Sequence, residues 1–112
     1  MSVLGDVYEF HSSHGLVHRL VCGSSTDSDV VARALGEGVL IDLVNTDPPY
    51  NVPIDGHVGG AGKVKHREFA MAAGEMTRGE FTAFLLRALQ NHADHSCDGS
   101  IHFVCMDWRH MG

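Results

Sequence analysis

Four consecutive residues, Asp47-Pro48-Pro49-Tyr50, bring together a carboxylate, a backbone carbonyl between two proline rings, and an aromatic ring. Each proline fixes its own φ, and Pro49 favours an extended conformation at Pro48, so this group is expected to be rigid. Rigid acceptors suit the exocyclic amino group of adenine, a poor nucleophile because its lone pair is delocalised into the ring. Asp47 and the Pro48 carbonyl could bind the amino hydrogens and direct that lone pair at an electrophilic methyl group. Tyr50 could stack on a base that has left the duplex.

A predicted strand leads directly into this tetrapeptide. Residues 39–44 are all β-branched or leucine except for Asp42, and such a continuous apolar run is typical of a buried parallel strand. Open α/β sheets bind their ligands beyond the carboxyl ends of their strands. The position of Asp47, shortly after this run, therefore indicates a ligand site.

The preceding residues predict a strand and a helix. Residues 18–22 form a short apolar-rich run, and a helix is expected to begin at Thr26 or Asp27 and to end at about Leu35, before two glycines. On the other side of the tetrapeptide, residues 51–74 contain five glycines and no sustained period, which predicts a long loop. Loops of this length are usually functional or disordered.

The last third of the chain predicts a second helix and a third strand. Thr77-Arg78-Gly79-Glu80 has the spacing of a capping box, and apolar residues recur at helical intervals up to about residue 93. Residues 101–106 form another apolar strand, which ends at Asp107-Trp108-Arg109-His110. The order strand, helix, strand, loop, helix, strand predicts an α/β fold of three layers, with parallel strands joined by crossover helices.

Composition limits the class of protein. A chain of 112 residues with 44% hydrophobic residues is long enough for one domain with a modest core. The net charge of −6 argues against nucleic-acid binding by bulk electrostatics, because phosphate neutralisation requires clustered Lys and Arg. One basic cluster exists, formed by Lys63, Lys65, His66 and Arg67. This cluster is either a local phosphate contact or a solvated loop.

Location and metal binding are also constrained by the sequence. No apolar stretch approaches the roughly 18 residues of a membrane span, and the first residues lack the layout of a signal peptide. Cys22, Cys97 and Cys105 are odd in number and irregularly spaced, which favours a reducing, cytoplasmic location. His92 and His95 lie at helical spacing but have no second matched pair, so we expect no metal site.

Four segments of the chain resemble, in order and spacing, the DNA amino-methyltransferases that act on exocyclic nitrogens of adenine or cytosine. The similarity is to the circularly permuted subgroup, in which the catalytic motif precedes the cofactor motif, and it covers most of the chain. The segments are Asp6-Val7-Tyr8-Glu9, His18-Arg19-Leu20-Val21-Cys22-Gly23, Leu43-Val44-Asn45-Thr46-Asp47-Pro48-Pro49-Tyr50-Asn51-Val52, and Phe103-Val104-Cys105-Met106-Asp107-Trp108-Arg109-His110.

This resemblance implies a partial Rossmann-like fold of S-adenosylmethionine-dependent methyltransferases over residues 1–112. Asp47 and the Pro48 carbonyl would orient the amino group and Tyr50 would stack on the base, while Pro49 and Asn51 would border it. Asn51 and Asp107 would also support the loop, and Lys63, Lys65 and Arg67 would contact phosphate. The implied cofactor is S-adenosylmethionine and the implied substrate is double-stranded DNA with a flipped base. Aspartate at the first motif position is similar to the adenine-modifying members.

The chain departs from the family pattern at two places, and both concern the expected cofactor site. Gly23-Ser24 stands where the family reads Gly-Asp, so Gly23, Ser24 and Asp47 are expected on the cofactor side, without the acidic side chain that reaches the cofactor's adenine in the family. The glycine-rich cofactor loop of the family would lie beyond residue 112, so the chain is expected to be the amino-terminal, catalytic-loop half. The alternatives are a catalytically inactive remnant that binds a complementing half or itself, and a methyltransferase that acts on RNA or on a protein amide.

Overall fold

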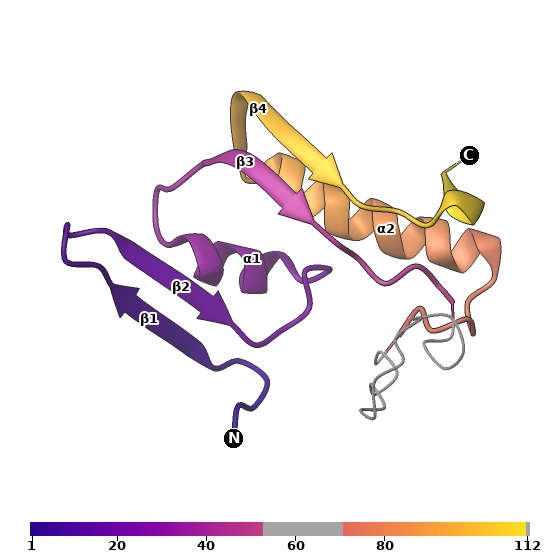
Figure 1. Ribbon diagram of the computed structural model, residues 1–112, viewed down its shortest axis with the longest axis horizontal. Helices are drawn as coiled ribbons and strands as arrows, with labels where there is room; N and C mark the ends of the chain where they lie inside the picture. Colours follow the sequence, from indigo (N-terminus) through magenta and orange to yellow (C-terminus); the bar gives the residue numbers. More distant parts are fainter. Residues whose placement is uncertain (53–70, 112) are drawn as a thin grey trace, which may run out of the picture.

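The computed structural model describes residues 1–52 and 71–111 and has a mixed α/β fold (Figure 1). In chain order the elements are β1 (Val7–His11), β2 (Val17–Val21), α1 (Ser28–Leu35), β3 (Ile41–Thr46), α2 (Arg78–Asp94), β4 (Ser96–Val104) and the short 3-10 helix η1 (Trp108–His110). The described strands form two sheets of two strands each, β1 with β2 and β3 with β4.

The first sheet corrects the sequence prediction. A strand forms at Val17–Val21, close to the expected residues 18–22, but it pairs antiparallel with β1 and does not join a parallel sheet. The cause is local. Gly15 adopts a φ of 79°, which glycine tolerates, and the Ser12 amide donates to the Leu16 carbonyl at 2.8 Å, so the chain reverses within a few residues. Closing so short a loop costs little entropy.

The second sheet confirms a parallel pair with a crossover helix. β3 and β4 run parallel, and their ladder continues past β4, because the Cys105 amide donates to the Thr46 carbonyl at 2.9 Å. α2 connects the two strands and lies along them in Figure 1. This unit places Asp47 directly after the carboxyl end of β3, as the apolar run predicted.

Both helices begin at the caps that the sequence predicted. The Asp27 carboxylate accepts from the Asp29 amide at 2.9 Å at the start of α1. At α2 the capping box is complete, because the Glu80 amide donates to Thr77 Oγ1 at 3.2 Å and the Thr77 amide donates to Glu80 Oε2 at 2.7 Å. These bonds satisfy amides that a helix leaves without partners at its first turn.

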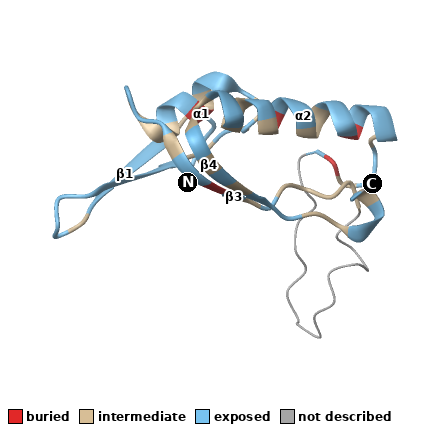
Figure 2. Cartoon of the chain, turned by 90° about the horizontal axis from the view of Figure 1, so that it is seen from above, coloured by how far each residue is buried: buried red, intermediate tan, exposed pale blue. Residues whose placement is uncertain are grey.

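α1 and α2 lie on the same side of the strands in Figure 2. The described residues therefore form two layers, and the third layer that the sequence led us to expect is not among them. The core is correspondingly small. Among the described residues, the buried apolar ones are Val31, Val44, Ala72, Phe81 and Ala88. No described helix has the length and apolar character needed to cross a membrane.

Candidate functional site

The first and last side chains of the tetrapeptide, Asp47 and Tyr50, are hydrogen-bonded to each other. The Tyr50 hydroxyl donates a hydrogen bond to Asp47 Oδ1, across the two prolines that separate these residues in the sequence. The pKa of Tyr50 is raised to about 12, and this bond is the largest cause. Partial burial and the negative charge of Asp47 are the next largest causes. Tyr50 is therefore protonated at neutral pH. The exposed Asp47 carboxylate accepts a hydrogen bond from the Tyr50 hydroxyl, and a donor on a ligand could replace that hydroxyl.

The end of β4 lies beside this pair. Cys105 and Asp107 both contribute electrostatically to the raised pKa of Tyr50. Asp107 caps η1, since its Oδ1 accepts from the Arg109 amide at 3.0 Å, and the same oxygen is 3.1 Å from Arg109 Nε. Its side chain is only 15% exposed, which fits a structural acid that fixes the turn after β4.

Asn51 ties the tetrapeptide to the start of α2. Its Nδ2 donates to the Met76 carbonyl at 2.7 Å, and its Oδ1 accepts from the amides of Gly74 and Met76, both at 3.1 Å. Its backbone has a φ of 57°, a conformation that asparagine adopts more readily than most residues. These three bonds within the protein engage Asn51 Oδ1 and one N–H of Nδ2, so Asn51 supports the loop.

Glu75 is a second supporting residue, whose role the sequence does not predict. Its carboxylate accepts from the amides of Ala72 at 2.5 Å and Ala73 at 2.6 Å. A hydrogen bond from its own backbone amide is the main cause that lowers the pKa of the Glu75 carboxyl group. The bonds from the amides of Ala73 and Ala72 lower this pKa further. A glutamate within a glycine-containing loop gives no sequence signal for this role, because the partners are backbone groups.

Gly23 and Ser24, the expected cofactor positions, form the turn between β2 and α1. A Cβ atom on Gly23 would lie 2.8 Å from a methyl group of Val30, so helix packing alone requires glycine there. The Ser24 hydroxyl lies 2.7 Å from the Thr26 hydroxyl, and the Ser24 carbonyl accepts from the Asp27 amide at 3.0 Å. These contacts give both positions a structural role in the turn that precedes α1.

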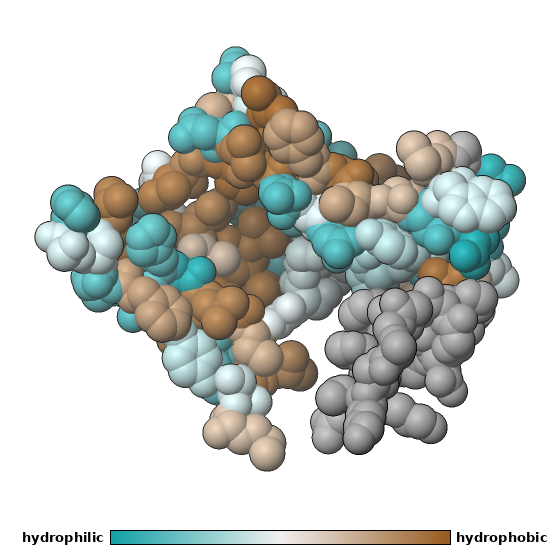
Figure 3. All heavy atoms as spheres, viewed as in Figure 1, coloured by the Kyte–Doolittle hydropathy of each residue, from teal (hydrophilic) through white to brown (hydrophobic). Residues whose placement is uncertain are grey.

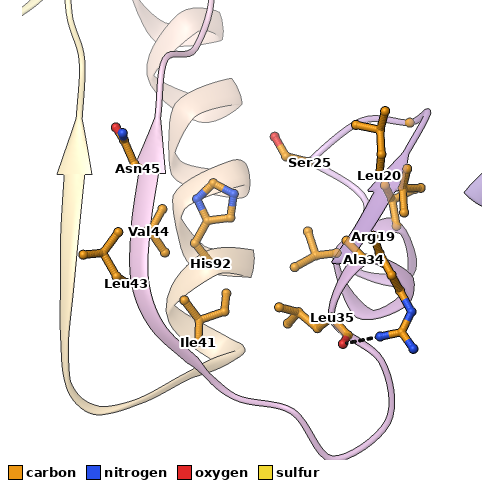
Figure 4. A pocket seen from close by; sticks show the side chains of 14 residues that line it. Arg19, Leu20, Ser25, Ala34, Leu35, Ile41, Leu43, Val44, Asn45 and His92 are labelled. Atoms are coloured by element: carbon orange, nitrogen blue, oxygen red, sulfur yellow. Dashed lines mark hydrogen bonds between the residues drawn. The ribbon is translucent and has the colours of Figure 1, made fainter. Parts of the chain in front are cut away.

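A cavity of about 450 Å³ separates β3 from β2 and α1 (Figure 4). Gly23 lines this cavity from one side, and Asn45, two residues before Asp47, lines it from the other. Most of the lining is aliphatic, with Arg19, Ser25, Asn45 and His92 as the polar members. The structure thus brings one expected cofactor position near the end of β3, although Asp47 itself does not line the cavity.

The remaining candidate residues are the basic cluster and the histidines. Lys63, Lys65, His66 and Arg67 lie outside the described residues. Within residues 1–52 and 71–111, no group of three or more His, Cys, Asp or Glu side chains is arranged to hold a metal ion. His95 Nδ1 instead lies 2.7 Å from the Asn91 carbonyl at the end of α2.

Comparison of the chain with protein-family models, with curated proteins and with solved structures gives no match in any of the three.

Proposed function

We propose that this chain carries the catalytic loop of a cytoplasmic DNA amino-methyltransferase that acts on the exocyclic amino group of a flipped adenine. The observation that supports the proposal best is the position of Asp47, at the carboxyl end of a parallel strand and hydrogen-bonded to Tyr50. Ligands of open α/β sheets bind at that end. The three cysteines are unpaired, in keeping with a reducing compartment.

In the proposed reaction Asp47 and Pro48 act as acceptors and Tyr50 as a stacking surface. An incoming adenine replaces the Tyr50 hydroxyl at Asp47, so its amino group donates one hydrogen to this carboxylate and the other to the Pro48 carbonyl. Both bonds draw the nitrogen lone pair out of conjugation. The released Tyr50 ring then stacks on the base, as aromatic side chains do in sites that hold extruded bases.

The described residues do not form a site for S-adenosylmethionine by themselves. The volume of the cavity beside β3, about 450 Å³, falls within the roughly 300–1,000 Å³ range of small-molecule pockets. Its lining, however, is mainly aliphatic and includes no Asp or Glu. A cofactor with ribose hydroxyls and an amino-acid group needs polar partners when it is buried.

The test of the proposal is transfer of a labelled methyl group from S-adenosylmethionine to adenine-containing DNA, together with calorimetric titration of the cofactor. Binding in the micromolar range, with transfer that is abolished by Asp47→Ala, would support the proposal. Transfer that is unchanged in this variant would contradict the role of Asp47. Absence of both binding and transfer would favour the second candidate below.

The second candidate function is a partner-binding half of such an enzyme, and the open edge of β3 favours it. Since Thr46 directs its carbonyl to β4, the alternate residues Leu43 and Asn45 direct their backbone groups to the opposite edge. No strand among the described residues pairs with that edge. Both residues line the aliphatic cavity of Figure 4, so an extended apolar segment would find backbone partners and apolar walls there.

The exposed face of the β3–β4 pair favours the same candidate. Leu43, Ile101 and Phe103 are each more than half exposed, and Leu43 and Ile101 are direct partners in the ladder. Figure 3 shows apolar side chains gathered over this part of the molecule. Contiguous apolar surface of this kind marks interaction sites. Sedimentation analysis of the purified chain would distinguish self-association from a monomer, and a stable monomer that binds cofactor would argue against this candidate.

A further inference from the structure

The β3–β4 pair carries apolar side chains on the face that turns away from α2. Successive side chains of a strand point to opposite faces, so paired residues of two strands share a face. Val44 is buried, and Figure 4 shows it on the side of His92, a residue of α2, with Leu43 on the other side. Leu43 pairs with Ile101, and Phe103 follows two positions later in β4. These three side chains therefore face away from α2.

The hairpin of β1 and β2 has a similar outward face. Arg19 faces α1, because its Nη1 donates to the Leu35 carbonyl at 2.9 Å. Its neighbour Leu20 therefore faces away from α1, together with its ladder partner Tyr8 and with Phe10, two positions further along β1. Since α1 and α2 lie on the same side of the strands in Figure 2, the outward faces of both sheets lie on the opposite side.

We call the outward positions of both sheets the open strand face. They are Tyr8, Phe10, His18, Leu20, Leu43, Asn45, Ile101 and Phe103. None of them is Asp, Glu, Lys or Arg, although the chain has a net charge of −6. Glu9 and Arg19 lie on the other side of the hairpin, where Arg19 Nε is 3.2 Å from Glu9 Oε2. Few charged residues and many aromatic ones characterise the centre of a protein–protein interface.

We propose that a second copy of this chain packs on the open strand face, with the two copies related by a two-fold axis. A face without charged groups offers no complement to a charged partner, whereas it can pack on its own copy without burying a charge. Two sheets that stack in this way lie about 10 Å apart. The second copy thereby covers the outward face of β3–β4, and parallel strands are normally covered on both faces.

The area of the open strand face is sufficient for such a dimer. Six of its side chains are large and apolar or aromatic, and each is 40–60% exposed. Because full burial of an aromatic residue removes about 150–250 Å², a half-exposed one presents on the order of 100 Å². Six of them present roughly 500–600 Å² per copy, so a dimer buries roughly 1,000–1,200 Å² in total, at the lower limit for a specific interface. We therefore expect a dissociation constant in the micromolar range.

This inference deepens the second candidate function above and rests on its premise that the exposed face binds a partner. The inference names that partner as a second copy, and it uses neither the open edge of β3 nor Asp47. A chain that stays monomeric but binds another strand at the edge of β3 would therefore refute the dimer and leave the second candidate in place. Methyl transfer by a monomer would refute the dimer and leave the first candidate in place.

Sedimentation equilibrium of the whole chain, from low to high micromolar concentration, measures the association. Ile101→Lys is the principal variant, because it introduces a charge into the apolar face of each copy. Phe10→Thr tests the hairpin, since threonine keeps the β-branched character that favours a strand. Leu86→Lys is the matched control. Leu86 is 64% exposed and lines a surface pocket that α2 residues form by themselves.

We expect the unmodified chain and Leu86→Lys to dimerise equally. Ile101→Lys should weaken the dimer by about 100-fold or more, because both copies would bury an unpaired charge. Phe10→Thr should weaken it about tenfold through the apolar area lost from both copies. Added salt should tighten the dimer, since it screens the repulsion between two copies that each carry a net charge of −6.

A chain that stays monomeric over this range, or that forms larger open-ended species, would overturn the proposal. A dimer that Ile101→Lys leaves unchanged, or that Leu86→Lys weakens equally, would overturn the location of the interface. A dimer that only Ile101→Lys weakens would overturn the contribution of the hairpin, and one that salt weakens would overturn its apolar character. Circular dichroism checks that each variant is folded. If Ile101→Lys is not folded, Phe103→Thr takes its place, with an expected loss of about tenfold.

Discussion

The Tyr50 hydroxyl donates a hydrogen bond to the Asp47 carboxylate, so two side chains that are proposed to bind the same base bind each other in its absence. This pairing keeps Asp47 directed toward Tyr50 and gives the carboxylate a partner that a base amino group can replace. The bond therefore has consequences for both titration and recognition.

The titration of Tyr50 tests this bond directly. Because the hydrogen bond to Asp47 and partial burial raise its pKa to about 12, the Tyr50 hydroxyl of a Tyr8→Phe variant should ionise with a midpoint near 12, followed by ultraviolet absorbance. Asp47→Ala in the same background should move the midpoint toward the ordinary value of 10.0. A midpoint that Asp47→Ala leaves unchanged would contradict the bond.

Any stability that the hydrogen bond between Tyr50 and Asp47 contributes is complete below pH 10. It is lost as pH rises toward 12, because in that interval Tyr50 ionises only in the unfolded chain.

Asn51 should be sensitive to substitution for two separable reasons. Asn51→Gly removes its three side-chain hydrogen bonds but keeps a residue suited to a φ of 57°. Asn51→Ala removes the same bonds and adds a left-handed backbone penalty of about 1 kcal/mol. Urea denaturation should show a loss of about 2–3 kcal/mol for Asn51→Gly, at about 1 kcal/mol per bond, and a larger loss for Asn51→Ala. Equal stability of both variants and the unmodified chain would exclude this supporting role.

Gly23 and Gly79 form a matched pair for testing the packing of α1. A Cβ atom on Gly23 meets Val30 at 2.8 Å, whereas one on Gly79 has nothing within 4 Å. Gly23→Ala should therefore lower the free energy of unfolding by about 1–3 kcal/mol. Gly79→Ala should raise it by up to about 1 kcal/mol, because alanine favours the helix. If Gly23→Ala were as stable as Gly79→Ala, the close approach of β2 and α1 would be wrong.

His92 should make the fold sensitive to mild acid. Burial contributes most to lowering the pKa of His92 below its ordinary 6.5, followed by the charges of His102 and His95. Its Nδ1 is buried and has no hydrogen-bond partner among the described residues. The folded chain then binds fewer protons than the unfolded chain, so stability is complete above about pH 6.5 and falls as pH drops below that value. Thermal denaturation between pH 7 and pH 5 should show a decline that His92→Gln reduces. The exposed His14, changed in the same way, is the control, and an equal effect of both changes would refute the assignment.

The sequence was sufficient to predict features with local causes. The capping box at Thr77 and Glu80, the helix behind it and the strand before Asp47 all depend on residues a few positions apart. It was insufficient where the partner is distant or is a backbone group. Asn51 binds Met76 across 25 positions, and nothing in either residue type predicts that contact. The hairpin of β1 and β2 was missed because the apolar run after Gly15 also fits a parallel strand.

The central claim is that Asp47 recognises the amino group of adenine, and a base-discrimination measurement tests it without requiring the cofactor. Two duplexes carry either adenine or purine, which lacks the amino group, opposite an abasic site, so that extrusion of the base costs little. A hydrogen bond to a charged group contributes about 1.5–3 kcal/mol, which corresponds to a preference for adenine of roughly 10- to 100-fold. We predict this preference in the unmodified chain and in the control variant Asp42→Ala. Asp42 is an exposed acid in β3, the strand that precedes Asp47, and its carboxylate lies 3.3 Å from Cys97 Sγ. Asp47→Ala should bind both duplexes equally. No preference in the unmodified chain, or an undiminished preference in Asp47→Ala, would contradict the claim.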